Sequence, residues 1–426
     1  MIPKGTIKEM KDRNGIAAGL PYARGLILSD TEDDFRKLQR AWKIIRLRVD
    51  RNGPDSVYNF SGLERSLPLA ANALQYCDDD IAPALYGDQF KAVALEHLGG
   101  IPDRHDAVLF NRMTAAIFAT HLALIKPGDV VVGISPTYSH PAVVRAGKPL
   151  GARFIDTQDE RQLAMALADE SRVALVVLTR LAVTYDVLPL ETIRAAIRLA
   201  HDKGAVVFAD DAGGARVGPA VFDQPRMLEL GVDIGATGLD KYGTIGPRLG
   251  LLAGDRSLVA RINARAFEFG LEARPMLYPA VVRSLEQYKP DRVRTLVAAT
   301  KQLARALRAT LGDRLHETPV TAQLRAEDIL QITLERSGLK ESPIVPFEAT
   351  AAIAMLLLED YGILTVHFAG LPPGTSSLLF KFVPPETLER FGGAETFSRA
   401  VDASLHKLAE LLKNPSDIRA LLLGDG

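Results

Sequence analysis

Apolar segments of strand length alternate with helical segments from about Val57 to Gly254, and no other feature of the sequence constrains the fold as strongly. Parallel strands need long crossover connections, usually helices, and strands covered on both faces are apolar throughout. The alternation therefore predicts an α/β fold with a mostly parallel seven-stranded sheet between helices. The predicted strands are Ala107–Phe110, Val130–Ile134, Arg153–Asp156, Val173–Leu178, Ala205–Ala209, Ile234–Ala236 and Gly250–Ala253. The predicted helices are Thr114–Leu124, Arg161–Ala168, Leu190–Asp202 and Gln224–Glu229.

A chain of 426 residues exceeds the size at which one core keeps growing, so more than one domain is expected. We predict an N-terminal arm and helix over residues 1–55, a large domain over 56–290 and a small C-terminal α+β domain over 291–426. The elements predicted for the small domain are a long helix Asp291–Leu311, strand Ile329–Leu334, helix Phe347–Asp360, strands Ile363–His367 and Leu378–Phe382, and helix Ala394–Leu412.

The N-terminal segment contains a predicted helix between Ser29 and Gly53, with acidic residues in its first turn. An apolar stripe runs along this helix, and we expect it to dock on its own domain or on a partner subunit. The stripe consists of Phe35, Leu38, Trp42, Ile45 and Val49. Through Arg51 the segment carries 12 basic and 7 acidic residues, so an RNA-contacting arm is an alternative interpretation.

Composition excludes several classes of protein. The formal charge is −1, which gives no overall field that would attract nucleic acid or an anionic membrane. The single cysteine, Cys77, cannot form an intramolecular disulfide, and the apolar runs are too short to span a bilayer. We therefore expect a cytoplasmic protein that binds no membrane, no nucleic acid and no metal.

The strongest candidates for chemistry are Asp210 and Lys241. An apolar strand stops at Asp210-Asp211, where a carboxylate would lie at the mouth of the sheet, and Lys241 follows 31 residues later in a glycine-rich loop. Each motif alone is ordinary, because acids are common in turns and most loop lysines are solvated. Together they suit pyridoxal 5'-phosphate, since the lysine can form a Schiff base with the cofactor aldehyde and the carboxylate can hold the pyridine nitrogen protonated.

A phosphate site is predicted where the strand ending at Phe110 meets the next helix. The free backbone N–H groups of a helix N-terminus bind anions, so Met113, Thr114 and Ala115 are candidate phosphate contacts. Thr237 could add a hydroxyl and Arg248 a positive charge. An ordinary capped helix is the alternative for this segment.

A flat cofactor ring also needs a stacking partner. The strand Val130–Ile134 leads to Tyr138 and His140, of which Tyr138 is the better candidate for stacking, and His140 is a further candidate for contact with the ring or substrate. Simple packing of an aromatic residue is the alternative.

The order of these segments resembles the fold type I pyridoxal phosphate-dependent enzymes, the aspartate aminotransferase superfamily, over roughly Tyr58 to Gly254. That resemblance implies a PLP transferase-like large domain. It assigns the phosphate to Thr114 and its neighbours, stacking to Tyr138, the ring nitrogen to Asp210 and the Schiff base to Lys241. Within the superfamily, three segments look most like the bacterial selenocysteine synthase (seryl-tRNA seleniumtransferase) branch. They are Gly238–Lys241, Gly246–Gly250 and Glu272–Leu277.

Two departures from aminotransferases shape the predicted reaction. Ala182–Tyr185 stands where they carry an Asn-Pro-Thr-Gly turn, and Lys381 stands where they carry a late arginine for the substrate carboxylate. A lysine offers a point charge instead of a two-pronged grip. We therefore predict a lyase or a group transfer at the β-carbon of an amino acid or related amine. Transamination, a tRNA-binding seleniumtransferase-like protein and a non-catalytic family member are the alternatives.

Further candidate contacts come from the same resemblance. Arg274, His367 and Lys381 are candidate substrate contacts. The family shares its active site across a homodimer or a higher homo-oligomer, and Tyr86 is the candidate for reaching the phosphate of a neighbouring subunit.

Overall fold

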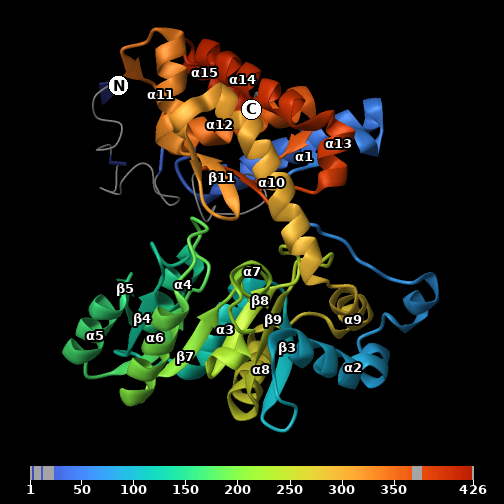
Figure 1. Cartoon of the computed structure of the whole chain (residues 1–426), viewed down its shortest axis with the longest axis vertical. Helices are drawn as coiled ribbons and strands as arrows, with labels where there is room; N and C mark the ends of the chain where they lie inside the picture. The colour runs from blue at the N-terminus through green and yellow to red at the C-terminus, as the bar shows by residue number, and fades with distance from the viewer. Residues whose placement is uncertain (1, 4–10, 13–23, 367–376, 425–426) are drawn as a thin grey trace. The chain divides into compact units, whose positions relative to one another are not determined.

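The computed structural model describes residues 2–3, 11–12, 24–366 and 377–424 (Figure 1). The chain divides into two compact units, and each is described by itself below. Glu64–Arg294 form one unit, here called the large unit, and Met1–Leu63 combine with Thr295–Gly426 in the other, the terminal unit. Residues 1–55, predicted as a separate arm, are thus grouped with the C-terminal segment. No helix in the described part of the chain is both long and apolar enough to cross a membrane.

A seven-stranded sheet forms the centre of the large unit, in the order β3-β9-β8-β7-β6-β4-β5. All its pairings are parallel except those of β9, which runs antiparallel to both of its neighbours. The predicted fold class is confirmed, and each predicted strand ends within two residues of an observed one. The strands are β3 His105–Phe110, β4 Val130–Ile134, β5 Arg153–Thr157, β6 Val173–Leu178, β7 Val206–Asp210, β8 Ile234–Gly238 and β9 Gly250–Asp255.

Helices cover both faces of the sheet. Side chains of successive strand residues accordingly enter two separate apolar clusters, one on each face. Val176 and Leu178 belong to one apolar cluster, whereas Leu175 and Val177 belong to the other. Strands buried on both faces read as continuous apolar runs, which is why the sequence marks them clearly. The helices of this unit are α2 Ile81–Leu98, α3 Met113–Leu124, α4 Pro141–Ala146, α5 Glu160–Asp169, α6 Leu190–Asp202, α7 Gly214–Phe222, α8 Arg256–Phe269 and α9 Tyr278–Glu286.

One helix predicted in the large unit is wrong. Gln224–Glu229 forms no α-helix, and the structure instead has α7 immediately before it and a short 3₁₀ turn at Leu228–Leu230. Pro219 lies inside α7 and counts against a helix in sequence reasoning. The helix ends at Phe222, and its C-cap Asp223 adopts a left-handed φ of 50°.

The terminal unit contains a three-stranded antiparallel sheet in the order β10-β11-β14. Its strands are β10 Leu315–Glu317, β11 Thr321–Leu324 and β14 Leu378–Lys381. Its helices are α1 Thr31–Asn52, α11 Ala326–Ser337, α12 Pro346–Tyr361, α13 Pro385–Phe391, α14 Gly393–Leu411 and α15 Pro415–Leu423. The long helix α10 Pro290–Leu311 begins in the large unit and continues into this one.

The predicted strand Ile329–Leu334 is wrong, because these residues lie within α11. Its β-branched residues favour a strand locally, but the helix has acidic residues in its first turn and ends at Gly338, whose φ is 74°. In this segment the helical and the strand pattern both place apolar side chains inward, so only tertiary packing decides between helix and strand.

Helix α1 has the predicted ends, with Asp30 as N-cap and Gly53 as C-cap. Its buried face differs from the predicted stripe. The stripe residues Phe35 and Trp42 are 44% and 53% exposed and pack edge to face on each other. The buried residues of the helix are instead Asp34, Lys37, Ala41 and Ile44. The buried face is therefore shifted by one residue from the predicted stripe. Two of its residues, Asp34 and Lys37, are charged, which is why the sequence pattern did not indicate this face.

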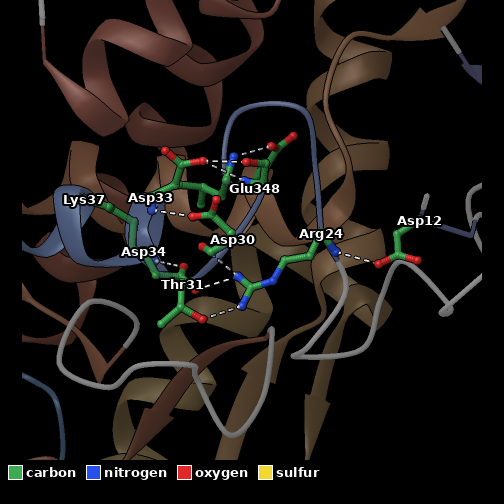
Figure 2. Close-up of polar contacts among 10 residues, drawn as sticks. Asp12, Arg24, Asp30, Thr31, Asp33, Asp34, Lys37 and Glu348 are labelled. Atoms are coloured by element: carbon green, nitrogen blue, oxygen red, sulfur yellow. Dashed lines mark hydrogen bonds and ion pairs between the residues drawn. The ribbon is translucent and has the colours of Figure 1, made fainter. Parts of the chain in front are cut away.

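That charged pair belongs to a network that Figure 2 shows around the start of α1. Arg24 binds Asp34 at 2.6 Å, and Asp34 also contacts Lys37 at 3.4 Å, so the buried carboxylate lies between two cations. The ammonium of Lys37 lies 5.4 Å from the centre of the Phe347 ring on α12. Burial lowers the pKa of Lys37, and Asp34 opposes that shift.

Candidate active site

The register of the sheet brings the predicted site segments to one edge. Gly250 at the start of β9 lies opposite both Phe110, the end of β3, and Gly238, the end of β8. The parallel strands β4, β6 and β7 end at the same edge, so the segments after all of these strands emerge together. In an open α/β sheet this carboxyl edge is where ligands bind.

Asp210 is the last residue of β7 and is only 4% exposed. No described residue donates a hydrogen bond or forms an ion pair with its carboxylate, an uncommon situation for a buried acid. Burial and the neighbouring charge of Asp211 raise the pKa of Asp210 to about 7, and the ammonium of Lys241 opposes this shift. Within residues 24–366 and 377–424, Asp210 is therefore a buried carboxylate with no cationic or N–H partner in contact with it.

The adjacent Asp211 has the opposite environment. Its Oδ1 accepts a hydrogen bond from Nε of Arg180 at 3.1 Å, and its Oδ2 pairs with the Nη2 of the same guanidinium. Arg180 also donates to the carbonyl of Pro225 at 2.7 Å. A Cβ on Gly214 would lie 2.2 Å from Oδ1 of Asp211, so a glycine is required there. Asp211 thus braces the strand end, while Asp210 stays available.

Lys241 lies half-buried in the loop between β8 and β9. Burial lowers the pKa of its amine, and the cations Arg248 and Arg65 lower it further, against the attraction of Asp240 and Asp210. The charge of Lys241 also contributes to the pKa of His140, which burial lowers to about 4. These mutual charge effects indicate that Lys241 lies near both Asp210 and His140.

The loop around Lys241 is fixed by side chains from several segments. The Thr244 hydroxyl lies 2.7 Å from the carbonyl oxygen of Leu239 and 2.9 Å from that of Lys241. Asp240 accepts a hydrogen bond from Nε of Arg65 at 2.9 Å. The hydroxyl of Tyr242 lies 2.6 Å from that of Tyr185, in the loop after β6.

The predicted phosphate site lies where α3 begins. Arg112 is the N-cap of this helix and makes no side-chain cap, so the first N–H groups have no side-chain acceptor at the cap. A Cβ on Gly250 would lie 2.9 Å from the backbone of Arg112, so β9 approaches the helix start closely. Exposed Thr114 lies in the first turn, and Met113 and Ala115 flank it.

Positive charge gathers beside this helix start. Arg248 is exposed, and its pKa is lowered by burial of part of its side chain and by the nearby charges of Arg65 and Arg112. Arg248 thus lies in the electrostatic reach of two further guanidinium groups, one of which is the N-cap residue of α3, and this positive charge near an uncapped helix N-terminus suits an anion.

The loop after β4 carries Tyr138 and His140. Tyr138 is half-buried, and its carbonyl accepts a hydrogen bond from the hydroxyl of Ser135 at 3.1 Å. The Nδ1 of His140 accepts from the backbone N–H of Ala142 at 3.1 Å, so this ring caps α4. The preceding Thr137 hydroxyl lies 3.0 Å from that of Thr184, which connects this loop to the one after β6.

Of the four other predicted contacts, two are engaged by other partners, one belongs to the terminal unit and one lies outside the described residues. The Thr237 hydroxyl is fully buried, donates to the carbonyl of Ala212 at 3.2 Å and accepts from Arg216 at 3.0 Å, so it has no proton left for a phosphate. Arg274 pairs with Asp79 beside a separate cavity of about 350 Å³. Lys381 is buried in β14 of the terminal unit, and His367 lies outside the described residues.

Several residues of the site escaped sequence reasoning. Arg65, Arg112, Arg180, Tyr185 and Tyr242 contribute charge or hydroxyl groups. Their partners lie far away along the chain, 175 residues in the case of Arg65 and Asp240. The only local signal was the cluster of small residues around Asp210, which leaves room for large neighbours.

The donor set fits the cofactor that the sequence predicts. Pyridoxal phosphate needs an amine of lowered pKa, a carboxylate for the ring nitrogen and an anion site for the phosphate. Lys241, Asp210 and the start of α3 offer these three groups at one edge of the sheet. Among the described residues, no three potential ligands gather closely enough to hold a metal ion.

Comparisons with known proteins point in the same direction. A UPF0425 pyridoxal phosphate-dependent protein of Methanothermobacter thermautotrophicus is 30% identical over 401 residues, covering 93% of this chain and 100% of the relative. A protein of the same description from Methanosphaera stadtmanae is 28% identical over 397 residues, with 93% and 100% covered. No protein-family model matches the chain.

Among solved structures, pyridoxamine-pyruvate aminotransferase from Mesorhizobium loti is similar in fold. The TM-score is 0.57 at 16% sequence identity, and the match covers 86% of this chain and 96% of the aminotransferase. This likeness shows an aminotransferase-like fold.

Proposed function

Because this chain belongs to the UPF0425 family of pyridoxal phosphate-dependent proteins, we propose that it is an enzyme that binds pyridoxal 5'-phosphate through Lys241 and acts on an amino acid or related amine. The observation that carries this proposal is the buried carboxylate of Asp210, which has no partner in the described part of the chain and lies in the electrostatic reach of a lysine whose pKa is lowered. A buried carboxylate without a partner destabilises a protein, because burial removes the water that would otherwise stabilise its charge. A protonated ring nitrogen would supply that partner.

Each side chain has a defined task in this proposal. Bound pyridoxal phosphate supplies an electron sink for carbanions at the α-carbon of an amine. Asp210 accepts a hydrogen bond from the ring nitrogen and keeps it protonated. Lys241 would hold the cofactor through its amine, and the same amine, when free, would move a proton at the α-carbon of the substrate. Tyr138 would stack on one face of the ring, and His140, from the same loop, is the further candidate for contact with the ring or substrate.

The phosphate is assigned to the start of α3. The backbone N–H groups of Met113 and Thr114 donate to its oxygens, and the Thr114 hydroxyl adds a further donor. The N–H of Ala115, the third predicted contact, already donates to the carbonyl of Arg112 at 3.0 Å. Arg248 contributes charge. Thr237 helps only indirectly, because its hydroxyl fixes Arg216 and the Ala212 carbonyl behind the site.

For the reaction, we favour a lyase or a group transfer at the β-carbon. The segment Ala182–Tyr185 offers no asparagine for the cofactor hydroxyl, and Lys381 stands in place of the late arginine. Transamination is the alternative that the experiments below distinguish. Four further points stay predictions. They are the finer resemblance to the selenocysteine synthase branch, a homodimer in which Tyr86 reaches the phosphate of the neighbouring subunit, substrate contacts by Arg274 and His367, and the cytoplasmic location.

The first test is spectral. Purified protein with added pyridoxal phosphate should develop a long-wavelength absorption band, and borohydride reduction followed by peptide mass analysis should place the cofactor on Lys241. Lys241→Ala should lose both signals, whereas Lys203→Ala, at an exposed lysine of the same unit, should keep them. Wild-type protein that stays colourless with excess cofactor would refute the proposal.

The second test separates the reaction classes. The loaded protein is incubated with a panel of amino acids while the cofactor spectrum and the products are followed. Release of ammonia and a keto acid with the original spectrum restored supports elimination, and transfer of a nucleophile to the β-carbon supports replacement. Stoichiometric conversion of the cofactor to its amine form supports transamination. Salt-dependent binding of tRNA would favour the seleniumtransferase-like alternative.

A further inference from the structure

Two tyrosines meet beside Lys241, although 57 residues separate them in the chain. The hydroxyls of Tyr185 and Tyr242 lie 2.6 Å apart, and their ring centres are 6.1 Å apart at an angle of 61°. Tyr185 is 6% exposed and Tyr242 is 4% exposed. Burial raises the pKa of both phenols, so each keeps its proton and one donates to the other.

Both tyrosines adopt backbone conformations that residues other than glycine rarely adopt. The φ of Tyr185 is 69° and that of Tyr242 is 44°, both in the left-handed region. For a bulky residue this region is strained and persists only where the surroundings impose it. Gly243 follows with a φ of 95°, so the chain turns sharply immediately after Lys241.

The chain also leaves room for the Tyr242 ring. A Cβ on Gly213, three residues past Asp210, would lie 2.1 Å from Cε2 of Tyr242. The ring therefore occupies the space that any side chain at position 213 would need. Tyr242 is held on one side by the segment that follows Asp210 and on the other by Tyr185.

The loop carrying Tyr185 is itself tied to the loop carrying Tyr138. Thr184 donates its hydroxyl proton to Asp186 at 2.7 Å, so Thr137 must be the donor in the 3.0 Å contact between Thr137 and Thr184. A path of side-chain hydrogen bonds and one peptide link thus runs from the residue before Tyr138 to the residue after Lys241.

We propose that Tyr185 and Tyr242 are positioning residues, whose hydroxyl pair holds the backbone at Lys241 in the turn that keeps its amine at the carboxyl edge of the sheet, where β7 ends at Asp210. The role of that amine rests on the proposed function. Neither phenol hydroxyl needs to touch reacting atoms, because the pair acts through the backbone conformation at Lys241. Without the pair, Tyr242 can relax out of the left-handed region and Lys241 can move toward water.

The test measures the amine of Lys241 directly, in protein without cofactor. Competitive labelling of lysines with acetic anhydride across a pH series, read by peptide mass analysis, gives the pKa of that single amine. We expect Tyr185→Phe and Tyr242→Phe each to raise this pKa toward the ordinary lysine value of about 10.4. At neutral pH each unit of that rise lowers the unprotonated fraction, and with it the rate of pyridoxal phosphate uptake, about tenfold.

The double variant provides the sharpest comparison. Because both single changes remove the same hydrogen bond, the double variant should show no larger shift than either single variant. Tyr278→Phe, which loses the hydroxyl of another partly buried tyrosine of the large unit, serves as the control and should match the wild type. Circular dichroism confirms that every variant is folded.

The outcomes separate the two proposals. A Lys241 pKa that is unchanged in both single variants, or single effects that add in full, would reject the positioning role. Failure of wild-type protein to take up cofactor would reject the proposed function instead, and the labelling result would still decide whether the tyrosines position Lys241.

Discussion

At the scale of single residues, the two neighbouring acids at the end of β7 have different environments. Asp211 is satisfied by the guanidinium of Arg180, whereas Asp210 has no hydrogen-bonding partner among the described residues. Without a partner for Asp210, the burial that raises the pKa of its carboxyl group destabilises the protein wherever that group is charged. Local instability of this kind is typical of functional sites.

This instability predicts a pH-dependent effect of Asp210→Asn. The pKa of Asp210 is raised to about 7 in the folded protein, above its ordinary value of 3.8. Below pH about 4 both folded and unfolded carboxyls are protonated, and above pH about 7 both are charged, so folded wild-type protein loses stability as the pH rises between these values. The asparagine variant escapes this loss.

Cofactor-free Asp210→Asn should therefore be more stable than the wild type at pH 8, by at most about 4 kcal/mol, and the difference should shrink toward pH 4. Urea unfolding at several pH values measures this, and the same variant should bind pyridoxal phosphate more weakly. Equal stability of the two proteins across the series would contradict the raised pKa.

At the scale of elements, one carboxylate attaches the segment before α1 to the start of α12 (Figure 2). Glu348 is fully buried, and its Oε1 accepts from the backbone N–H groups of Ile27 at 2.6 Å and Leu28 at 2.9 Å. Its Oε2 accepts from the N–H of Val345 at 3.1 Å, which caps α12. Burial raises the pKa of Glu348, and these three donors oppose that shift.

Gly25 and Glu348 should therefore be energetically coupled. A Cβ on Gly25 would lie 2.0 Å from Oε1 of Glu348, so Gly25→Ala must displace a carboxylate held by three hydrogen bonds. We expect Gly25→Ala and Glu348→Ala each to destabilise the protein by about 2 to 3 kcal/mol. The double variant should be no less stable than Glu348→Ala alone, because the clash is gone. Urea unfolding measures all three, and full additivity would argue against the contact.

At the scale of the whole molecule, the chain consists of two units, and the proposed cofactor contacts all come from one of them. Asp210, Lys241, the start of α3 and the loop after β4 belong to Glu64–Arg294. Cofactor binding should therefore stabilise this unit by mass action, since the site does not exist in the unfolded chain.

At a pyridoxal phosphate concentration a hundred times its Kd, the gain is about 2.7 kcal/mol, which shifts the Tm of a unit of this size up by about 5 to 10 °C. Calorimetry of wild-type protein should show this shift, and amide hydrogen exchange should locate new protection in residues 113–117 and 236–250. Lys241→Ala should shift far less. A shift of equal size in that variant would mean that the ligand binds elsewhere.

The sequence predicted the elements whose local pattern agrees with their burial. All seven strands of the large sheet were found, and α6, α10, α12 and α14 lie within a residue of the prediction. The regions where prediction failed have ambiguous local patterns. The β-branched residues of α11 suggested a strand, and a buried ion pair on α1 hid its inward face.

By itself, the sequence determined the fold class and the order of the candidate groups along the chain, because apolar periodicity and strand-end acids are local properties. Only the tertiary structure decided which of these groups meet. The order of the strands, which no local pattern encodes, brings Arg65 to Asp240, Arg180 to Asp211 and Tyr185 to Tyr242. A hydrogen bond requires its donor and acceptor to lie within about 3.2 Å of each other, so the chemistry of the site depends on contacts that spacing along the chain cannot predict.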